Sequence, residues 1–306
     1  MAKNRRAATL HGYVVIDKPG GWTSHDVVGR VRRILGERRV GHAGTLDPAA
    51  VGVLPIAVGY ATRTVEYLAS SSKSYRAEIT FGFETDSADG DGVMIGSPRP
   101  ICFSESELLA AICQFAGDLQ QVPPMHSAVK IDGKRLYELA RVGEEVEVAP
   151  RAITIHRIKC IRWESPVATI EMRCSKGTYV RSIARDLGRS LGMGAHLSNL
   201  VRTQTGLFSL ADAITLDELA RKFACEPWAE IAYHPDSVLH DLPAAIVGAE
   251  RAIEWQQGKV VAVKECAGTV RVYDSMGRWL GVGSAVEEGN FVQPEKVILP
   301  ERDGIQ

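Results

Sequence analysis

The chain has 306 residues, a formal net charge of −1, 45% hydrophobic residues and 24% charged residues. These are ordinary values for a soluble protein, and the length suffices for one large domain and one small one. No run of residues approaches the roughly 18 apolar residues of a membrane helix. The basic start of the chain also lacks the apolar core of a signal peptide. We therefore expect a cytoplasmic protein with no membrane partner and with a flexible basic arm over residues 1–10.

The charge is unevenly distributed along the chain. Residues 1–76 contain 12 Lys/Arg and 5 Asp/Glu, a local charge of +7, so the remaining residues sum to −8. Such asymmetry favours a polyanionic partner bound by one part of the chain. A solvated basic face explains the same count equally well.

The first elements are a strand and a helix. The apolar run 13–16 predicts a strand, and "DKPGG" predicts a turn. Thr23, with Asp26 three residues later, is typical of a helix N-terminus, and apolar residues then recur at helical spacing up to Leu35. Arginines lie off this apolar stripe, where they form either a solvated helix face or a surface for a polyanionic partner. These are Arg30, Arg32 and Arg33.

A lone carboxylate marks the next stretch, "GHAGTLDPAAVGVLPIAVG". Asp47 is the only acidic residue between Gly41 and Gly59, and Pro48 follows it directly. Glycosidase chemistry needs two carboxylates and phosphate cradling needs a P-loop, and neither occurs here. An isolated Asp is then a nucleophile or general base kept ionised by a nearby Arg, or a structural capping residue. The apolar run that follows predicts a buried strand, and residues 62–68 predict a short helix.

The middle of the chain alternates between strands and loops. Alternating apolar residues predict a strand from Tyr75 to Phe81, and "ETDSADGDG" predicts a polar loop, since it lacks the spacing of a calcium-binding EF-hand. Residues 104–116 predict an amphipathic helix. The stretch 123–151 is a long excursion with a "DGK" turn and a helical "RLYELARVG", which is typical of a functional loop.

The last part of the chain contains one more strand–helix unit, a linker and a segment of short strands. Residues 168–174 predict a strand, and a helix is expected to begin near Thr178, with Arg181 in its first turn beside a strand end. Residues 233–244 are typical of a linker. Short apolar runs separated by Gly and "DSMG" turns then predict a small β-rich module.

Four motifs together resemble the TruB family of pseudouridine synthases. They occur in the family's order over about residues 12–210 and are "GHAGTLDPAAVGVLPIAVGYATR", "KSYRAEITFG", "VPPMHSAVK" with "GKRLYELAR", and "SKGTYVRSIARDLG". The resemblance implies an α/β (α+β) pseudouridine synthase catalytic domain with a mixed, largely antiparallel sheet over residues 11–230. It further implies an RNA-gripping insertion at about 123–151 and a PUA-like β domain at 242–302.

The implied activity is an isomerase reaction, the conversion of uridine 55 in the T-loop of tRNA to pseudouridine, without cofactor or metal. Asp47 matches the catalytic aspartate, Arg181 the arginine that pairs with it, and Tyr75 the tyrosine that stacks on the flipped base. The other matching residues have binding or shaping roles. His42 fills space left by the flipped base, Leu200 packs near the uracil, Lys18 shapes the site, and Lys130, Lys134 and Arg135 contact phosphates.

Two alternatives remain open at this stage. One is a guide-dependent relative that acts on ribosomal RNA, against which the absence of long basic tails argues. The other is a tRNA-folding chaperone whose chemistry is secondary. The partner expected in each tRNA case is the T-arm, with no obligatory protein partner. The sequence does not distinguish attack at uracil C6 from attack at ribose C1′, and it does not give the oligomeric state.

Overall fold

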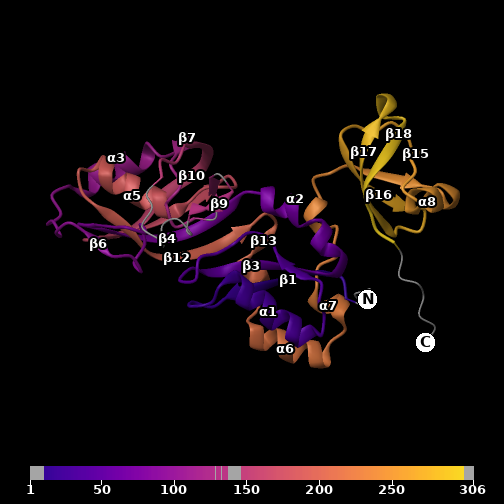
Figure 1. Cartoon of the computed structure of the whole chain (residues 1–306), viewed down its shortest axis with the longest axis horizontal. Coiled ribbons are helices and arrows are strands. Elements are labelled where there is room, and N and C mark those ends of the chain that lie inside the picture. The colour runs from indigo at the N-terminus through magenta and orange to yellow at the C-terminus, as the bar shows by residue number, and fades with distance from the viewer. Residues whose placement is uncertain (1–9, 128, 132, 137–145, 300–306) are drawn as a thin grey trace.

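The computed structural model describes residues 10–127, 129–131, 133–136 and 146–299 (Figure 1). Its strands form one nine-stranded sheet and one five-stranded sheet, with two small two-stranded ribbons. No helix among these residues is both long and apolar enough to cross a membrane.

The nine-stranded sheet forms the larger part of the molecule. Its central path is β1 (Gly12–Lys18), β3 (Val51–Val58), β12 (Ala195–Thr205), β4 (Lys73–Phe81), β11 (Val167–Cys174), β10 (Arg151–Glu164) and β7 (Gly117–Gln121). Two short strands, β2 (Val40–His42) and β13 (Phe208–Ser209), pair with β3 and β12. Every pairing in this sheet is antiparallel except β12 with β3. The expected mixed, largely antiparallel sheet is confirmed.

Helices flank the sheet and link its strands. The α-helices are α1 (Ser24–Leu35), α2 (Val65–Ser70), α3 (Glu105–Cys113), α5 (Val180–Ser190), α6 (Leu216–Cys225), α7 (Trp228–Ile231) and α8 (Ala249–Gln256). Short 3-10 turns cover Gly59–Arg63, Leu210–Asp212, Ser237–Leu239 and Glu287–Gly289.

Helix α1 shows how local sequence determines its limits. The Thr23 side chain accepts from the Asp26 amide, and the Asp26 side chain accepts from the Thr23 amide, which completes the expected capping box. Gly36 ends the helix in the left-handed region with φ 67. Val27 and Val31 on its apolar face are buried against β1 and β3.

Most expected elements occur where the sequence places them. The strands at 13–16, in the run after Asp47, at 75–81 and at 168–174 are confirmed, as is the helix within 104–116. The helix expected near Thr178 begins at Val180. The helix expected in "RLYELARVG" falls mostly on residues 137–145, outside the described residues. The sequence did not predict α6 or the long strand β12.

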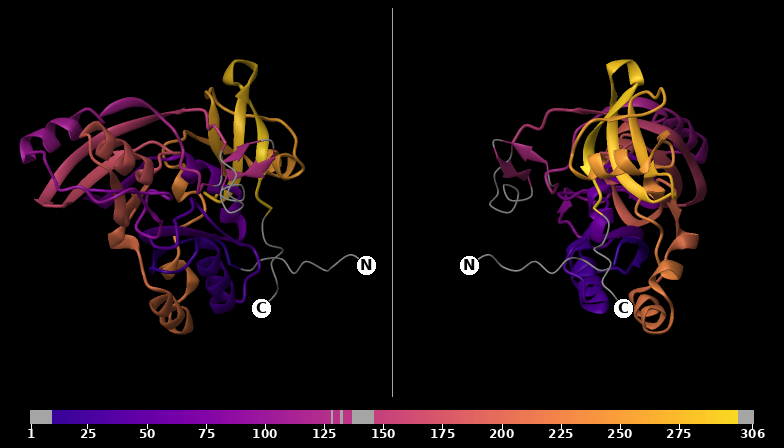
Figure 2. Two further views of the ribbon diagram at one scale, coloured as in Figure 1. Left: turned by 60° about the vertical axis from the view of Figure 1, so that its left-hand side comes forward. Right: turned by 90° about the vertical axis from the view of Figure 1, so that its right-hand side faces the viewer.

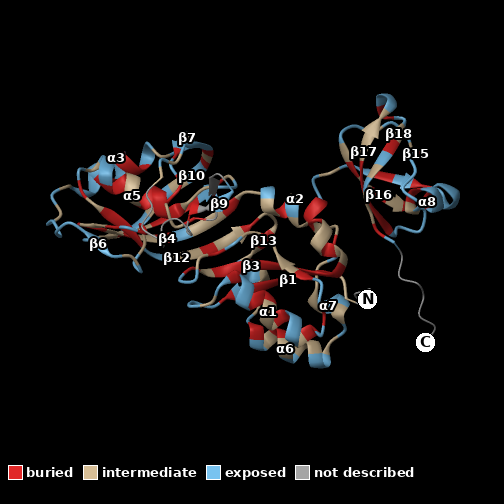
Figure 3. Ribbon diagram, viewed as in Figure 1, coloured by how far each residue is buried: buried red, intermediate tan, exposed pale blue. Residues whose placement is uncertain are grey.

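Two hydrophobic clusters meet in the middle of the large sheet. One joins α3 and α5 to β4, β10 and β11, and the other joins α1 and α6 to β1 and β3. The buried residues of these strands show as red segments along the sheet in Figure 3. Tyr75 and Leu200 pack against both clusters, so these two side chains mark the junction. A site at the junction draws its residues from both halves of the sheet.

The five-stranded sheet forms a module at the C-terminal end of the described chain, separate from the large sheet in Figure 1. Its order is β14 (Ala244–Val247), β16 (Thr269–Asp274), β17 (Trp279–Val286), β18 (Phe291–Val297) and β15 (Val261–Ala262). Trp255 of α8 is fully buried in its core. The module contacts the larger part through Lys296 Nζ and Glu66 Oε1, which lie 2.7 Å apart.

The two small ribbons lie at the edges of the large sheet. They are β5 (Glu84–Thr85) with β6 (Met94–Ile95), and β8 (Lys130–Ile131) with β9 (Lys134–Arg135). Figure 2 shows the β8–β9 ribbon projecting away from the rest of the molecule in its right-hand view. This ribbon belongs to the excursion that the sequence marked as a functional loop.

Gly52 is a position where only glycine fits. Its φ is +97, and a Cβ built there would lie 2.4 Å from the Arg202 carbonyl oxygen of the neighbouring strand β12. We predict that Gly52→Ala lowers the free energy of unfolding by about 3 kcal/mol, because backbone strain and overpacking add. Gly29→Ala is the control, since Gly29 lies within α1 with nothing within 4 Å of the added methyl group. It should stabilise the protein by about 0.5–1 kcal/mol. Equal urea midpoints for the two variants would contradict the prediction.

Candidate active site

Asp47 lies on the loop between β2 and β3. The loop turns at Gly44, where φ is +98, and it is tied to the start of α1 because the Leu46 amide donates to Ser24 Oγ at 2.9 Å. The Asp47 side chain itself remains 45% exposed. The backbone is therefore held, while the carboxylate stays accessible to a ligand.

Arg181 supplies the partner of this carboxylate. It lies in the first turn of α5, and its side chain is only 6% exposed. Its Nε atom lies 3.0 Å from Asp47 Oδ2, and its Nη1 atom lies 3.4 Å from Asp89 Oδ2. It also donates to the carbonyls of His126 at 2.8 Å and Ser87 at 3.3 Å. The guanidinium is thus held by two segments, the acidic loop of Ser87 and Asp89 and the segment of His126, besides the Asp47 loop with which it is paired.

Asp89 is a site residue that the sequence did not single out. It lies in the acidic segment expected to be a polar loop, where Ser87 Oγ donates to Asp89 Oδ1 at 2.5 Å and the Asp91 amide donates to the same oxygen at 3.2 Å. Ala88, between Ser87 and Asp89, has a φ of 60°, an uncommon value for a non-glycine residue. The loop is shaped to present one carboxylate to Arg181. Its density of aspartates was the only signal in the sequence.

A cavity of about 340 Å³ opens beside the Asp47–Arg181 pair. Its volume lies in the range of small-ligand pockets. It is lined by Asp47, Pro48, Ala49, Asp86, Ser87, Asp89, Asp91, Gly92, Val93, His126 and Arg181. Arg181 is therefore the one Lys or Arg in a lining that includes four aspartates. Any ligand that brings its own negative charge here must approach that cation.

Tyr75 lies on β4 at the junction of the two hydrophobic clusters. Burial raises the pKa of its hydroxyl above the ordinary value, and the Arg202 guanidinium opposes that rise. The hydroxyl is consequently protonated at neutral pH. Leu200 of β12 packs in the same junction.

His42 ends β2, and its ring lies edge-on to His25 with centroids 5.6 Å apart. Burial is the main cause that lowers the pKa of His42, and the charges of His25 and Arg202 add to it. His42 is therefore neutral at physiological pH, as a group that packs beside an uncharged base would be.

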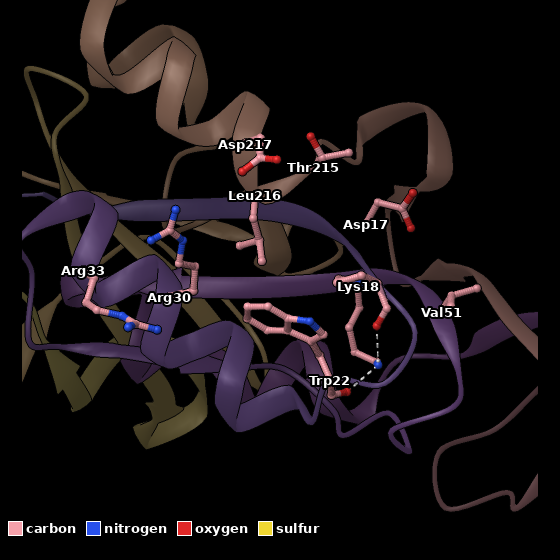
Figure 4. Close-up of a pocket in the computed structure, with 10 residues that line it drawn as sticks. Asp17, Lys18, Trp22, Arg30, Arg33, Val51, Thr215, Leu216 and Asp217 are labelled. Atoms are coloured by element: carbon pink, nitrogen blue, oxygen red, sulfur yellow. Dashed lines mark hydrogen bonds between the residues drawn. The ribbon is translucent and has the colours of Figure 1, made fainter.

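Lys18 ends β1, contacts the backbone of the Asp47 loop and does not line the cavity. The residue is fully buried, and its Nζ donates to the carbonyls of Trp22 at 2.5 Å, Pro19 at 2.9 Å and Pro48 at 2.9 Å. Figure 4 shows Lys18 turned toward the Trp22 carbonyl. Lys18 thereby holds the residue that follows Asp47.

A second cavity, of about 600 Å³, opens beside Lys18, between α1 and the start of α6 (Figure 4). Its lining includes Trp22, Arg30, Arg33 and Asp217 but none of the Asp47 cluster. Although it is larger, it does not hold the paired carboxylates. The smaller cavity is therefore the candidate active site.

The basic residues predicted to contact phosphates lie in the β8–β9 ribbon. Lys130 pairs with Arg135 and Ile131 with Lys134 in its antiparallel register. Lys134 is exposed. The ribbon is far along the chain from the Asp47 loop.

No group of three or more His, Cys, Asp or Glu residues in the described part of the chain could hold a metal ion. The expectation of a reaction without metal or cofactor stays a prediction.

Comparison with protein families gives three adjoining matches. Residues 32–180 match "TruB family pseudouridylate synthase (N terminal domain)", and residues 181–251 match "tRNA pseudouridylate synthase B C-terminal domain". Residues 243–298 match "Pseudouridine synthase II TruB, C-terminal". The Asp47 loop, β4 and the start of α5 fall at or within the first two matches.

Curated relatives and solved structures agree with these matches. A protein of Symbiobacterium thermophilum named tRNA pseudouridine synthase B is 49% identical over 267 residues, covering 86% of this chain and 87% of its own. A protein of the same name from Trichormus variabilis is 42% identical, with 95% and 99% covered. A chain in the crystal structure of a Cbf5-Nop10-Gar1 complex superimposes with a TM-score of 0.74 at 26% identity, covering 94% of this chain and 85% of that one.

The buried ammonium of Lys18 generates a stability prediction. Lys18→Met leaves three carbonyls without their donor, so we predict a loss of about 2–4 kcal/mol in the free energy of unfolding. Lys222→Met, which removes only the exposed pair with Glu226, should change it by less than about 0.5 kcal/mol. Urea unfolding of both variants measures the difference. A Lys18→Met protein as stable as the wild type would show that the loop does not depend on this contact.

The raised pKa of Tyr75 generates a pH prediction. Above about pH 10 the unfolded state loses the phenol proton while the folded state keeps it, because the folded pKa is raised. The contribution of this group to the free energy of unfolding is therefore complete below about pH 10 and is lost as the pH rises through the folded pKa. Between about pH 9 and pH 11 the unfolding free energy of the wild type should therefore fall relative to that of Tyr75→Phe, which has no phenol proton to lose. Unfolding in urea at the two pH values measures it. A constant difference would mean that Tyr75 titrates alike in both states.

Proposed function

Because this chain belongs to the TruB family of pseudouridine synthases, we propose that it converts uridine 55 in the T-loop of tRNA to pseudouridine, with Asp47 as the nucleophile. The observation that carries the proposal is the accessible Asp47 carboxylate held 3.0 Å from the buried Arg181 guanidinium at the cavity wall. A charge-assisted hydrogen bond from a fixed guanidinium holds the carboxylate in one orientation.

The reaction is an isomerisation and needs no outside atom. The target nucleotide leaves the stack, at a cost of a few kcal/mol, and its base enters the cavity. Asp47 attacks uracil C6 or ribose C1′, the bond from N1 to C1′ breaks, and the base turns. A bond then forms between C5 and C1′, C5 loses its proton and N1 gains one. Asp47 is released unchanged, so one carboxylate suffices.

The remaining site residues have supporting roles in the proposal. Tyr75 stacks on the flipped base. Late in the reaction, after water has taken the proton of its hydroxyl, the Tyr75 phenolate accepts the C5 proton. His42 fills the space that the base leaves, Leu200 packs beside the uracil, and Lys18 keeps the Asp47 loop in place.

The RNA is held by phosphate contacts that carry little sequence information. Lys130, Lys134 and Arg135 of the β8–β9 ribbon provide these contacts, within an insertion at about 123–151. The arginines of α1 add a second basic surface. The division into a basic arm over 1–10, a catalytic domain over 11–230 and a PUA-like β domain over 242–302 belongs to the same proposal, with the T-arm as the partner.

Two other functions have weaker support. Structural similarity to a chain of the Cbf5-Nop10-Gar1 complex favours a guide-dependent relative, but at 26% identity it is more distant than the curated relatives named tRNA pseudouridine synthase B. A tRNA-folding chaperone role is compatible with the same RNA surface. It does not account for a carboxylate paired with a buried arginine.

Tritium release from unmodified tRNA labelled at uracil C5 tests the proposal. The wild type should release tritium from one uridine per tRNA, and Asp47→Asn should be slower by at least about 10,000-fold, as for the loss of a nucleophile. Asp89→Asn should slow release about ten- to a hundredfold, because Arg181 loses one of the two charges that fix it.

Glu84→Gln is the matched control for Asp89→Asn. Glu84 Oε2 pairs with Arg189 Nη2 at 2.8 Å, so this variant removes another ion pair to helix α5 without touching Arg181. Its rate should stay within about twofold of the wild type. Tight tRNA binding without any release by the wild type would refute the enzymatic proposal and favour the chaperone role.

A further inference from the structure

Arg202 of β12 is a buried cation that the proposed chemistry has not used. The residue is 1% exposed, and its guanidinium donates to the carbonyls of Val53 at 2.8 Å, Gly44 at 3.1 Å and Thr45 at 3.3 Å. Gly44 and Thr45 immediately precede Leu46 and Asp47, and Val53 lies on β3, which follows the loop. One side chain therefore spans the two ends of the segment that carries Asp47.

The charge of Arg202 has no carboxylate partner within ion-pair distance among the described residues. Burial lowers the pKa of its guanidinium, and the only opposing group is Tyr75. A buried charge without a counter-ion is costly, and such groups are retained mainly where they have a function.

Tyr75 is the second neighbour of this guanidinium. Arg202 and Tyr75 are direct cross-strand partners in the antiparallel register of β12 with β4, so their side chains project from the same face. The charge of the neighbouring Arg202 guanidinium lowers the pKa of the Tyr75 hydroxyl, which burial raises.

The backbone around Arg202 is arranged to allow this approach. Strands β3 and β12 are parallel there, with Arg202 opposite Gly52, and a Cβ on Gly52 would lie 2.4 Å from the Arg202 carbonyl oxygen. The glycine in the Asp47 segment thus permits the contact between the strand carrying Arg202 and the strand that ends the loop. Lys18 Nζ also donates a hydrogen bond to this segment, at the Pro48 carbonyl.

We propose that Arg202 is a positioning residue that fixes the Asp47 loop relative to the Tyr75 hydroxyl through one buried guanidinium. The nucleophile lies on the loop before β3 and the aromatic residue lies on β4, and no direct hydrogen bond or ion pair between them is recorded among the described residues. Arg202 bonds the backbone of the Asp47 loop and is the cross-strand partner of Tyr75. When Tyr75 takes the C5 proton it must do so as a phenolate, and the adjacent positive charge favours that form. The inference rests on the proposed function, because it assigns Arg202 to the same reaction.

Single-turnover tritium release by Arg202→Gln, with tRNA affinity measured separately, tests the proposal. The rate should fall about a hundredfold, as for the loss of one preorganised donor, while the Kd for tRNA stays within about threefold of the wild type. Arg202→Lys keeps the charge with fewer donors and should recover about tenfold of that loss.

Arg271→Gln is the matched control. Arg271 is a partly buried arginine of the C-terminal sheet. It donates to the Leu242 carbonyl at 3.0 Å and to the Tyr273 hydroxyl at 3.4 Å. Its rate should equal that of the wild type. A similar loss in both arginine variants would show that the effect is general destabilisation and would overturn the proposal.

A double-mutant comparison separates positioning from a purely structural role. Tyr75→Phe keeps the ring and removes the hydroxyl, so the part of the rate that depends on Arg202 positioning this hydroxyl is already lost in the Tyr75→Phe variant. Arg202→Gln should then slow Tyr75→Phe by about tenfold rather than a hundredfold. Equal effects in both backgrounds would contradict the link through Tyr75.

The same measurements distinguish this inference from the function on which it rests. Absence of release by the wild type refutes the function, whereas normal release by the wild type and by Arg202→Gln refutes only the role of Arg202. Where Arg202→Gln shows no native circular dichroism spectrum, Arg202→Lys decides. A native Arg202→Lys protein slowed at least fivefold at unchanged Kd supports the proposal, and one with the wild-type rate overturns it.

Discussion

The site depends on one guanidinium placed between two carboxylates from different loops. Arg181 reaches Asp47 on the β2–β3 loop and Asp89 on the acidic loop after β5, and carbonyls of two further residues complete its bonds. A buried arginine is stable only when such partners are present. The two loops are therefore held at one distance from each other, and the cavity between them has a defined shape before any ligand arrives.

Two more buried cations hold the segment that carries Asp47. Lys18 binds the Pro48 carbonyl, and Arg202 binds the Gly44 and Thr45 carbonyls. Backbone carbonyls carry only partial negative charge, so Asp47 is the one full anion in this segment. The arrangement fixes the backbone strongly and leaves the carboxylate free to react.

Hydrophobic periodicity and capping residues predicted most of the strands and the limits of α1, because these depend on neighbours within a few residues. The resemblance pointed to Asp47 and Arg181, which the fold brings within 3.0 Å of each other. Asp89 and Arg202 could not be found in this way. Their roles arise from pairing across the sheet and between loops that are far apart in the chain, and a polar loop or a strand arginine has no local signature of such contacts. The helix expected in the 123–151 insertion falls mostly outside the described residues.

The most direct test of this account is to map every pseudouridine formed in a complete set of unmodified tRNAs after incubation with the wild-type protein. A single preorganised cavity with one nucleophile should modify one position, uridine 55, in each tRNA and leave all other uridines unchanged. Modification of several positions in different loops, or of none, would contradict the claim that the Asp47–Arg181–Asp89 arrangement forms a site for one flipped uridine.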